Sequence, residues 1–209
     1  MAVHVGGKPL ADFSAPIEMM KDCHRRIEHF LEVLQAAERR FGGSNLDEEG
    51  RHALDASLNY FANFAPRHTA DEEQSLFPRM RSSGDLDARA VLADLERLAN
   101  DHRGCEALHA HVHGVVSNWL GTGRLDATQR SGLRAALDEL IRIYAAHIQL
   151  EEGHVFVVAD RILRAEQIQE IGEEMRERRS LAGLGHTGVS LFEKERLQPE
   201  RPSRHGVGR

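Results

Sequence analysis

The chain has 209 residues, a formal net charge of −6 and a hydrophobic fraction of 41%. Its length suits one domain with a sizeable core, and its acidic balance argues against a nucleic-acid partner, which needs a basic face. No apolar run approaches the roughly 20 residues of a membrane span, and residues 1–20 lack the apolar core of a secretory signal. We therefore expect a cytoplasmic protein that binds neither nucleic acid nor membrane.

The first half of the chain predicts two long helices after an irregular N-terminal arm at residues 1–13. Apolar residues recur at helical spacing over 17–34, and a Gly-Gly pair ends this helix. The second helix is predicted over 47–80. Pro66 falls inside it, so we expect a bend or a brief break there, because proline removes a backbone hydrogen bond.

The second half predicts two more long helices and a short one. Helical apolar spacing covers 86–120 and 127–163, and a shorter pattern over 165–179 predicts a fifth helix. The Gly-, Pro- and Arg-rich residues 181–209 predict a mobile tail. No alternating β-branched run predicts a strand. Because the connections are short, neighbouring helices should be antiparallel, which gives an all-α up-down-up-down four-helix bundle with a C-terminal helix over 14–180.

An internal duplication is the most informative feature of the sequence. In each half of the chain, a single histidine is followed by a His-x-x-x-Glu pair. These residues are His24, His68 and Glu72 in the first half, and His102, His147 and Glu151 in the second. On a helix, residues four apart lie on one face, about 6 Å apart along the axis. Each pair can therefore direct one imidazole and one carboxylate at the same point.

The six duplicated residues predict a metal site in the core of the bundle. Each histidine lies in an apolar stripe near the middle of its helix. Burying two carboxylates without a counter-charge costs several kcal/mol each, and cations remove that penalty. Imidazoles and carboxylates without a thiolate favour a borderline transition metal. The count fits two ions bridged by Glu72 and Glu151, each with two imidazoles and one open position.

Other side chains compete for a place at this site. Glu73 and Glu152 directly follow the favoured glutamates but lie further around the helix from the histidines. Further candidate ligands are Glu28, Glu106, His109, His154, Cys23 and Cys105. For each of these a solvated, salt-bridged or packed role is the alternative. Tyr144, one turn before His147, can donate a proton or an electron, or can simply pack in the core.

The pattern resembles the hemerythrin-like family, the His-His-Glu cation-binding bundles. The matching residues are His24 in Asp-Cys-His-Arg, His68 and Glu72 in a segment ending Leu-Phe-Pro, His102 in Asn-Asp-His-Arg, and His147 with Glu151. The resemblance covers about residues 14–164, and its most specific part is the segment Glu-Glu-x-x-Leu-Phe-Pro. It implies a non-haem centre of two iron ions with an oxo or hydroxo bridge, with manganese or zinc as the alternatives.

The resemblance also implies a protein that binds or reacts with O₂, NO or peroxide. Oxygen-carrying members have a second histidine where this chain has Glu106, and an Asp five residues after the last histidine rather than Glu151 at four. The present set is closer to bacterial di-iron proteins implicated in repairing iron–sulfur centres damaged by nitric oxide or oxidants. Stress defence or iron-centre repair is therefore expected. The alternatives are a non-catalytic gas- or iron-binding sensor and a structural bundle with zinc or no metal.

Overall fold

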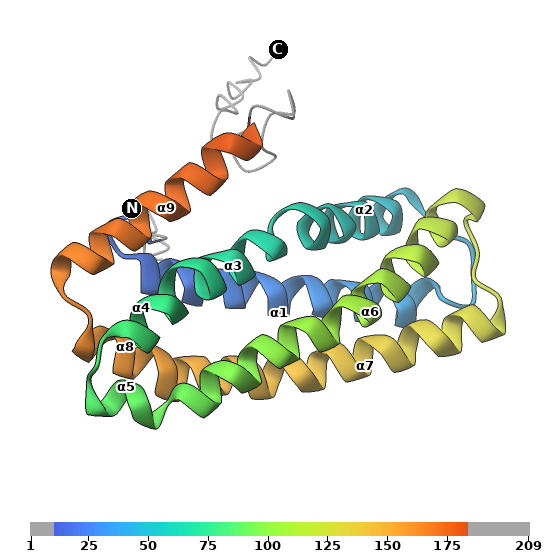
Figure 1. Cartoon of the computed structure of the whole chain (residues 1–209). Coiled ribbons are helices and arrows are strands. Elements are labelled where there is room, and N and C mark those ends of the chain that lie inside the picture. The colour runs from blue at the N-terminus through green and yellow to red at the C-terminus, as the bar shows by residue number, and fades with distance from the viewer. Residues whose placement is uncertain (1–10, 184–209) are drawn as a thin grey trace, which may run out of the picture.

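The computed structural model describes residues 11–183, which form an all-α bundle (Figure 1). Its elements are α1 (Pro16–Phe41), α2 (Glu48–Asn63), α3 (Ala65–Asp71), the π-helical turn η1 (Glu72–Leu76), α4 (Phe77–Ser82), α5 (Leu86–Ala90), α6 (Leu92–Thr122), α7 (Ala127–Leu150), the π-helical turn η2 (Glu151–Val155), α8 (Phe156–Ile162) and α9 (Ala165–Gly183). Most of the predicted arm and all but the start of the predicted tail lie outside the described residues. Within 11–183, every helix falls short of the length and apolarity needed to cross a membrane.

The long helices form four antiparallel rods, as the sequence predicted. α1 packs against α2 and α7, and α6 packs against the same two helices, so the rods close a ring (Figure 1). The connections from α1 to α2 and from α6 to α7 meet at one end of the bundle. There the Leu46 N–H donates to the Gly123 carbonyl at 3.1 Å. The predicted up-down-up-down order is therefore confirmed.

Local sequence signals explain where the rods begin, break and end. Asp126 begins α7 with a capping box in which its side chain accepts from the Gln129 N–H at 2.8 Å. Gly123 ends α6 with a φ of 77°, a left-handed conformation that favours glycine. The break expected near Pro66 occurs at Phe64, between α2 and α3. Proline sits in the first turn of α3, where its missing N–H is tolerated.

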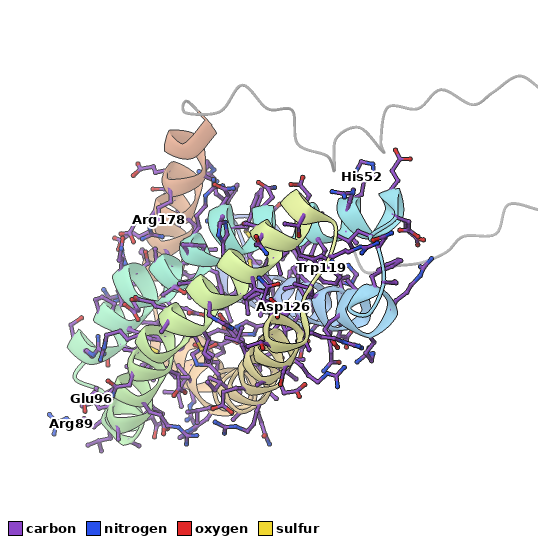
Figure 2. All side chains as sticks on the ribbon, turned by 90° about the vertical axis from the view of Figure 1, so that its right-hand side faces the viewer. His52, Arg89, Glu96, Trp119, Asp126 and Arg178 are labelled. Atoms are coloured by element: carbon purple, nitrogen blue, oxygen red, sulfur yellow. The ribbon has the colours of Figure 1, made fainter. Side chains whose placement is uncertain are left out.

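The apolar core consists of two clusters, one toward each end of the bundle. One cluster is built around Trp119 and Leu137, and the other around Phe77 and Phe156; all four side chains are fully buried. Figure 2 shows Trp119 among the helices, whereas side chains such as His52 point outward. Between the two clusters, near the middle of the rods, lies a layer that the duplicated histidines occupy.

The predicted fifth helix is α9, which packs against α1, α3 and η1. Its attachment depends on Asp71, a fully buried carboxylate at the end of α3. Asp71 receives the guanidinium groups of Arg178 at 2.7 Å and Arg179 at 2.6 Å. A buried carboxylate needs such partners because an unpaired charge in the interior is costly. The pairing fixes α9 against the segment that directly precedes Glu72.

Candidate metal centre

The six duplicated residues all lie together in the middle layer of the bundle. His24 comes from α1, His68 from α3, His102 from α6 and His147 from α7, while Glu72 and Glu151 begin η1 and η2. Both glutamates and His24 are fully buried, and His68 and His147 are nearly so. The structure therefore brings every predicted ligand to one point. That these side chains hold metal ions stays a prediction.

The histidines divide into two pairs that share both glutamates. His24 and His68 form the first histidine pair, and His102 and His147 form the second. In each group of two histidines with Glu72 and Glu151, one ligand atom per residue lies within 4.8 Å of the others. Each pair comes from one half of the duplicated sequence. The sequence left open how the histidines are paired, and the structure groups them into these two pairs.

Each glutamate directs one carboxylate oxygen toward each histidine pair. Glu72 Oε1 lies 3.0 Å from His68 Nε2, and its Oε2 lies 3.4 Å from His102 Nε2. Glu151 Oε2 lies 3.0 Å from His24 Nε2, and its Oε1 lies 3.4 Å from His147 Nε2. A carboxylate placed in this way can bridge two ions, one bound at each oxygen. The arrangement therefore matches the two-ion, two-bridge expectation.

A π-helical turn begins at each glutamate, a feature that the spacing of the apolar residues does not predict. η1 begins at Glu72 and η2 at Glu151, so the duplication extends to the backbone. Hydrogen bonds to the fifth residue widen these turns, and such turns are frequent at functional sites. The four-residue spacing by itself predicts an α-helical turn at both positions. The shared run His-x-x-x-Glu-Glu was the only sequence signal of this change in geometry.

The site carries buried polar atoms that lack hydrogen bonds. Both oxygens of Glu72, both oxygens of Glu151 and the Nε2 atom of His24 are buried without a hydrogen-bond partner. The nitrogen atoms nearby are close, but none has hydrogen-bond geometry toward these oxygens. Unsatisfied buried groups cost about 1–3 kcal/mol each, and more when they are charged. Bound cations would satisfy all of them, so the donor set fits a nitrogen- and oxygen-ligated metal.

The same geometry perturbs the pKa values of the histidines. Burial lowers the pKa of His24, but the carboxylates of Glu151 and Glu72 outweigh this effect and raise it to about 10. The pKa of His102 is raised to about 9, because Glu72 and Glu73 outweigh its burial. The adjacent imidazoles hold the pKa of Glu72 well below its usual value despite its burial. In the metal-free chain, protons therefore provide the positive charge that this layer requires.

Metal binding should release about two protons per chain at neutral pH, because His24 and His102 must be deprotonated to act as ligands. Their pKa values of about 10 and about 9 mean that metal competes with bound protons. The apparent affinity should therefore fall as the solution becomes more acidic and rise up to this pKa range. Calorimetric titration with Zn²⁺ in buffers of different ionisation enthalpy counts the protons. Binding without proton release would contradict the expectation.

Glu73 and Glu152, the rival carboxylates, contact the site from outside: each lies against the Nδ1 atom of one of the six residues. The Nδ1 atom of His24 lies 2.8 Å from Glu152 Oε1, and the Nδ1 atom of His102 lies 2.8 Å from Glu73 Oε1. Each contact joins a histidine of one half of the duplication to a glutamate of the other. A carboxylate that accepts from Nδ1 fixes the ring and leaves the Nε2 lone pair directed at the site.

The two histidine pairs differ in this outer layer. His147 Nδ1 has a carboxylate nearby, Asp101 Oδ2 at 3.6 Å, whereas His68 Nδ1 is buried without a hydrogen-bond partner. Asp101 directly precedes His102, and the corresponding position before His24 holds Cys23. Burial raises the pKa of the Cys23 thiol, so this side chain stays neutral. The first histidine pair therefore has one neighbouring outer carboxylate fewer than the second.

The second histidine pair should consequently take up metal first. Loss of an outer carboxylate typically weakens metal binding about 10–100-fold, so the first equivalent of Zn²⁺ should bind predominantly at His102 and His147. Histidine-selective NMR during a Zn²⁺ titration would assign the order. In Asp101→Asn, the matched control, the two pairs should fill together. Earlier perturbation of His24 and His68 in the wild-type chain would contradict this prediction.

The remaining candidate ligands do not reach the site. Glu28 pairs with Arg25 at 2.8 Å, and His154 pairs with Asp94 at 2.9 Å. The other candidates, Glu106, His109, Cys23 and Cys105, also lie outside both ligand groups, as far as the structure describes the chain. Cys23 and Cys105 are buried free thiols, in line with the packed alternative.

Comparisons with known proteins agree with this picture. The family described as the hemerythrin HHE cation binding domain matches residues 15–159 of the chain. The chain is also 26% identical over 172 residues to an uncharacterized protein of Haemophilus influenzae, a match that covers 82% of this chain and 94% of that protein. The span matched by the family contains all six residues of the site.

Proposed function

Because the chain belongs to the hemerythrin HHE cation-binding domain family, we propose that its metal-binding module is a non-haem di-iron centre that binds or reacts with O₂, NO or peroxide. One ion would be held by His24 and His68 and the other by the second histidine pair, with Glu72 and Glu151 shared. The observation that carries this proposal is the position of each glutamate, with one oxygen toward each histidine pair. Iron at these positions would supply open coordination and one-electron redox chemistry.

The surroundings of the site support a small ligand. Apolar clusters lie on both sides of the ligand layer, and the ring of Phe156 stacks on His24 with 5.6 Å between ring centroids. The side chain of His102 is the most accessible of the six, with an exposed fraction of 9%. A layer enclosed in this way holds water away from the imidazoles and strengthens their electrostatic interactions. A diatomic gas or peroxide fits such surroundings better than a large substrate does.

The proposed physiological role is cytoplasmic stress defence or iron-centre repair. The four-histidine, two-glutamate donor set supports it, because the oxygen-carrying members of the family have an additional imidazole at the position of Glu106. That side chain is exposed and lies outside both ligand groups. A centre with fewer imidazoles keeps more coordination positions open to reactants.

The decisive experiment is elemental analysis combined with an aerobic absorption spectrum of protein purified without chelator. The proposal expects about two irons per chain and an oxo-to-ferric charge-transfer band in the near ultraviolet. A single zinc, or no metal, would overturn it. Adding NO or peroxide to the iron-loaded chain then separates two roles. Steady consumption indicates reaction, and a reversible stoichiometric spectral change without consumption indicates a binding or sensing module.

A further inference from the structure

Tyr144 and His109 form a hydrogen-bonded pair beside the metal centre. The Tyr144 hydroxyl, on α7, lies 3.0 Å from His109 Nε2, on α6. The ring of Tyr144 also meets the edge of His147, with 6.2 Å between ring centroids. Neither residue belongs to the ligand groups. The pair therefore connects directly to one predicted ligand without being a ligand itself.

The environment of the pair keeps both side chains neutral. Burial lowers the pKa of His109 to about 4, so its ring is neutral at physiological pH. Burial also raises the pKa of Tyr144, which keeps the phenol protonated. When His109 carries its proton on Nδ1, the phenol O–H donates and the lone pair of His109 Nε2 accepts. The ring of Phe61, 4.9 Å from His109 between centroids, covers the acceptor on another side.

We propose that Tyr144 and His109 form a proton-coupled one-electron redox site adjoining the metal centre. When Tyr144 is oxidised, its O–H bond breaks, one electron leaves the phenol ring, and the proton moves to His109 Nε2. The products are a neutral tyrosyl radical and an imidazolium at His109, a half-buried side chain. The electron goes to a one-electron oxidant, which in the proposed function is an oxidised transition metal held through His147. Re-reduction returns the electron to the ring and the proton from His109 to the phenol oxygen.

The proton acceptor makes this oxidation feasible inside the protein. An oxidised phenol that keeps its proton is a very strong acid, far stronger than an imidazolium, so leaving the proton on the phenol oxygen is energetically costly. An imidazole already at hydrogen-bond distance takes the proton as the electron leaves, so no charged phenol has to form. A pKa of about 4 is sufficient for this acceptor, because the oxidised phenol is far more acidic.

Tyr60, the other tyrosine of the chain, provides a matched control. It is buried and its hydroxyl also donates a hydrogen bond, but the acceptor is the backbone carbonyl of Cys23 at 3.2 Å. A carbonyl oxygen accepts a hydrogen bond but is too weak a base to take the proton. The indole N–H of Trp119 is buried without any partner. Tyr60 and Trp119 are thus buried aromatic groups without a proton acceptor, whereas the half-buried Tyr144 has one.

The test uses the full chain loaded with Zn²⁺, which is redox-silent, and a photogenerated ruthenium(III) polypyridyl complex as the one-electron oxidant. We expect a neutral tyrosyl radical in the wild-type chain, detected by electron paramagnetic resonance and optical absorption. Its yield should fall at least roughly tenfold in Tyr144→Phe and stay unchanged in Tyr60→Phe. A radical of unchanged yield in Tyr144→Phe, or its loss in Tyr60→Phe, would overturn the proposal.

His109→Gln tests the proton acceptor separately from the tyrosine. Glutamine can accept the hydrogen bond but cannot take the proton. The oxidation rate of Tyr144 should therefore fall about tenfold or more. The ratio of the oxidation rates in H₂O and D₂O, the solvent isotope effect, should also change. An unchanged rate and an unchanged isotope effect would overturn the role of His109. Circular dichroism of each zinc-loaded variant confirms that the helical bundle is intact.

This proposal rests on the proposed function only for the identity of the natural oxidant. Because zinc replaces iron in the test, its outcome does not depend on any reaction with O₂, NO or peroxide. A tyrosyl radical in the zinc-loaded chain, together with iron that is inert toward these molecules, would overturn the proposed function and support the redox pair. Reactive iron without the radical would support the proposed function and overturn the redox pair.

Discussion

Replacing Glu72 with Gln should reduce the bound iron from about two ions per chain to one or fewer, with an affinity loss above roughly 100-fold. The fully buried carboxylate faces both histidine pairs through its two oxygens, so its loss affects both ions. The amide has nearly the same shape but offers one oxygen and no charge. Metal content after anaerobic reconstitution with Fe²⁺ and gel filtration measures the effect. Glu151→Gln should behave in the same way.

Two matched controls separate this effect from a general loss of acidic side chains. Glu106→Gln alters an exposed glutamate outside the ligand groups and should leave iron binding unchanged. Glu73→Gln alters the carboxylate behind His102 and should weaken binding about 10–100-fold without abolishing it. If Glu72→Gln retained both ions at wild-type affinity, the bridging arrangement would be wrong.

Removal of the metal should lower the free energy of unfolding by about 4 kcal/mol or more. A ligand at 1,000 times its dissociation constant stabilises the folded state by about that amount, and two ions add their effects. At about 2–4 °C per kcal/mol for a domain of this size, the melting temperature should fall by roughly 10 °C or more. The physical reason is the ligand layer between the two apolar clusters, where buried carboxylates lose their counter-charge.

Differential scanning calorimetry before and after treatment with a chelator measures this shift. The control is the double variant Glu72→Gln and Glu151→Gln, which should melt at the same temperature with and without chelator, because it holds little metal. Protons on His24 and His102 partly replace the lost cations, so the shift should grow as the pH rises toward 9 or 10. A wild-type melting temperature that is insensitive to chelator, with two ions measured beforehand, would contradict the prediction.

Most of the fold could be predicted because its signals are local. Apolar residues at helical spacing predicted the rods, and local caps at Asp126 and Gly123 explain where α7 begins and α6 ends. Pro66 marked the break at Phe64, because a proline acts on its own helix. The docking of α9 could not be predicted in the same way. Asp71 and its partners Arg178 and Arg179 are far apart in sequence. No local pattern around any of them predicts that they form ion pairs.

The candidate site likewise combines features that local sequence predicts with features that only the packing of the helices decides. The duplication singled out the six residues that the structure brings together, and the four-residue spacing explains why the glutamate of each His-x-x-x-Glu pair shares a helix face with its histidine. The spacing did not reveal the two histidine pairs, because pairing depends on how the four rods are arranged around the site. From spacing alone, Glu73 and Glu152 are only alternative ligands. Their contacts with His24 and His102 could not be predicted, because these histidines lie on other helices.

Residue types and spacings along each helix thus predict the helical rods, their order and the donor set of the candidate centre, since these follow from contacts within a few residues. Packing between the rods establishes which histidines share each position, which carboxylates support them, and that the hydroxyl of Tyr144 meets His109. Such contacts join residues from different helices. Their distances depend on how the whole core packs, which no local pattern records.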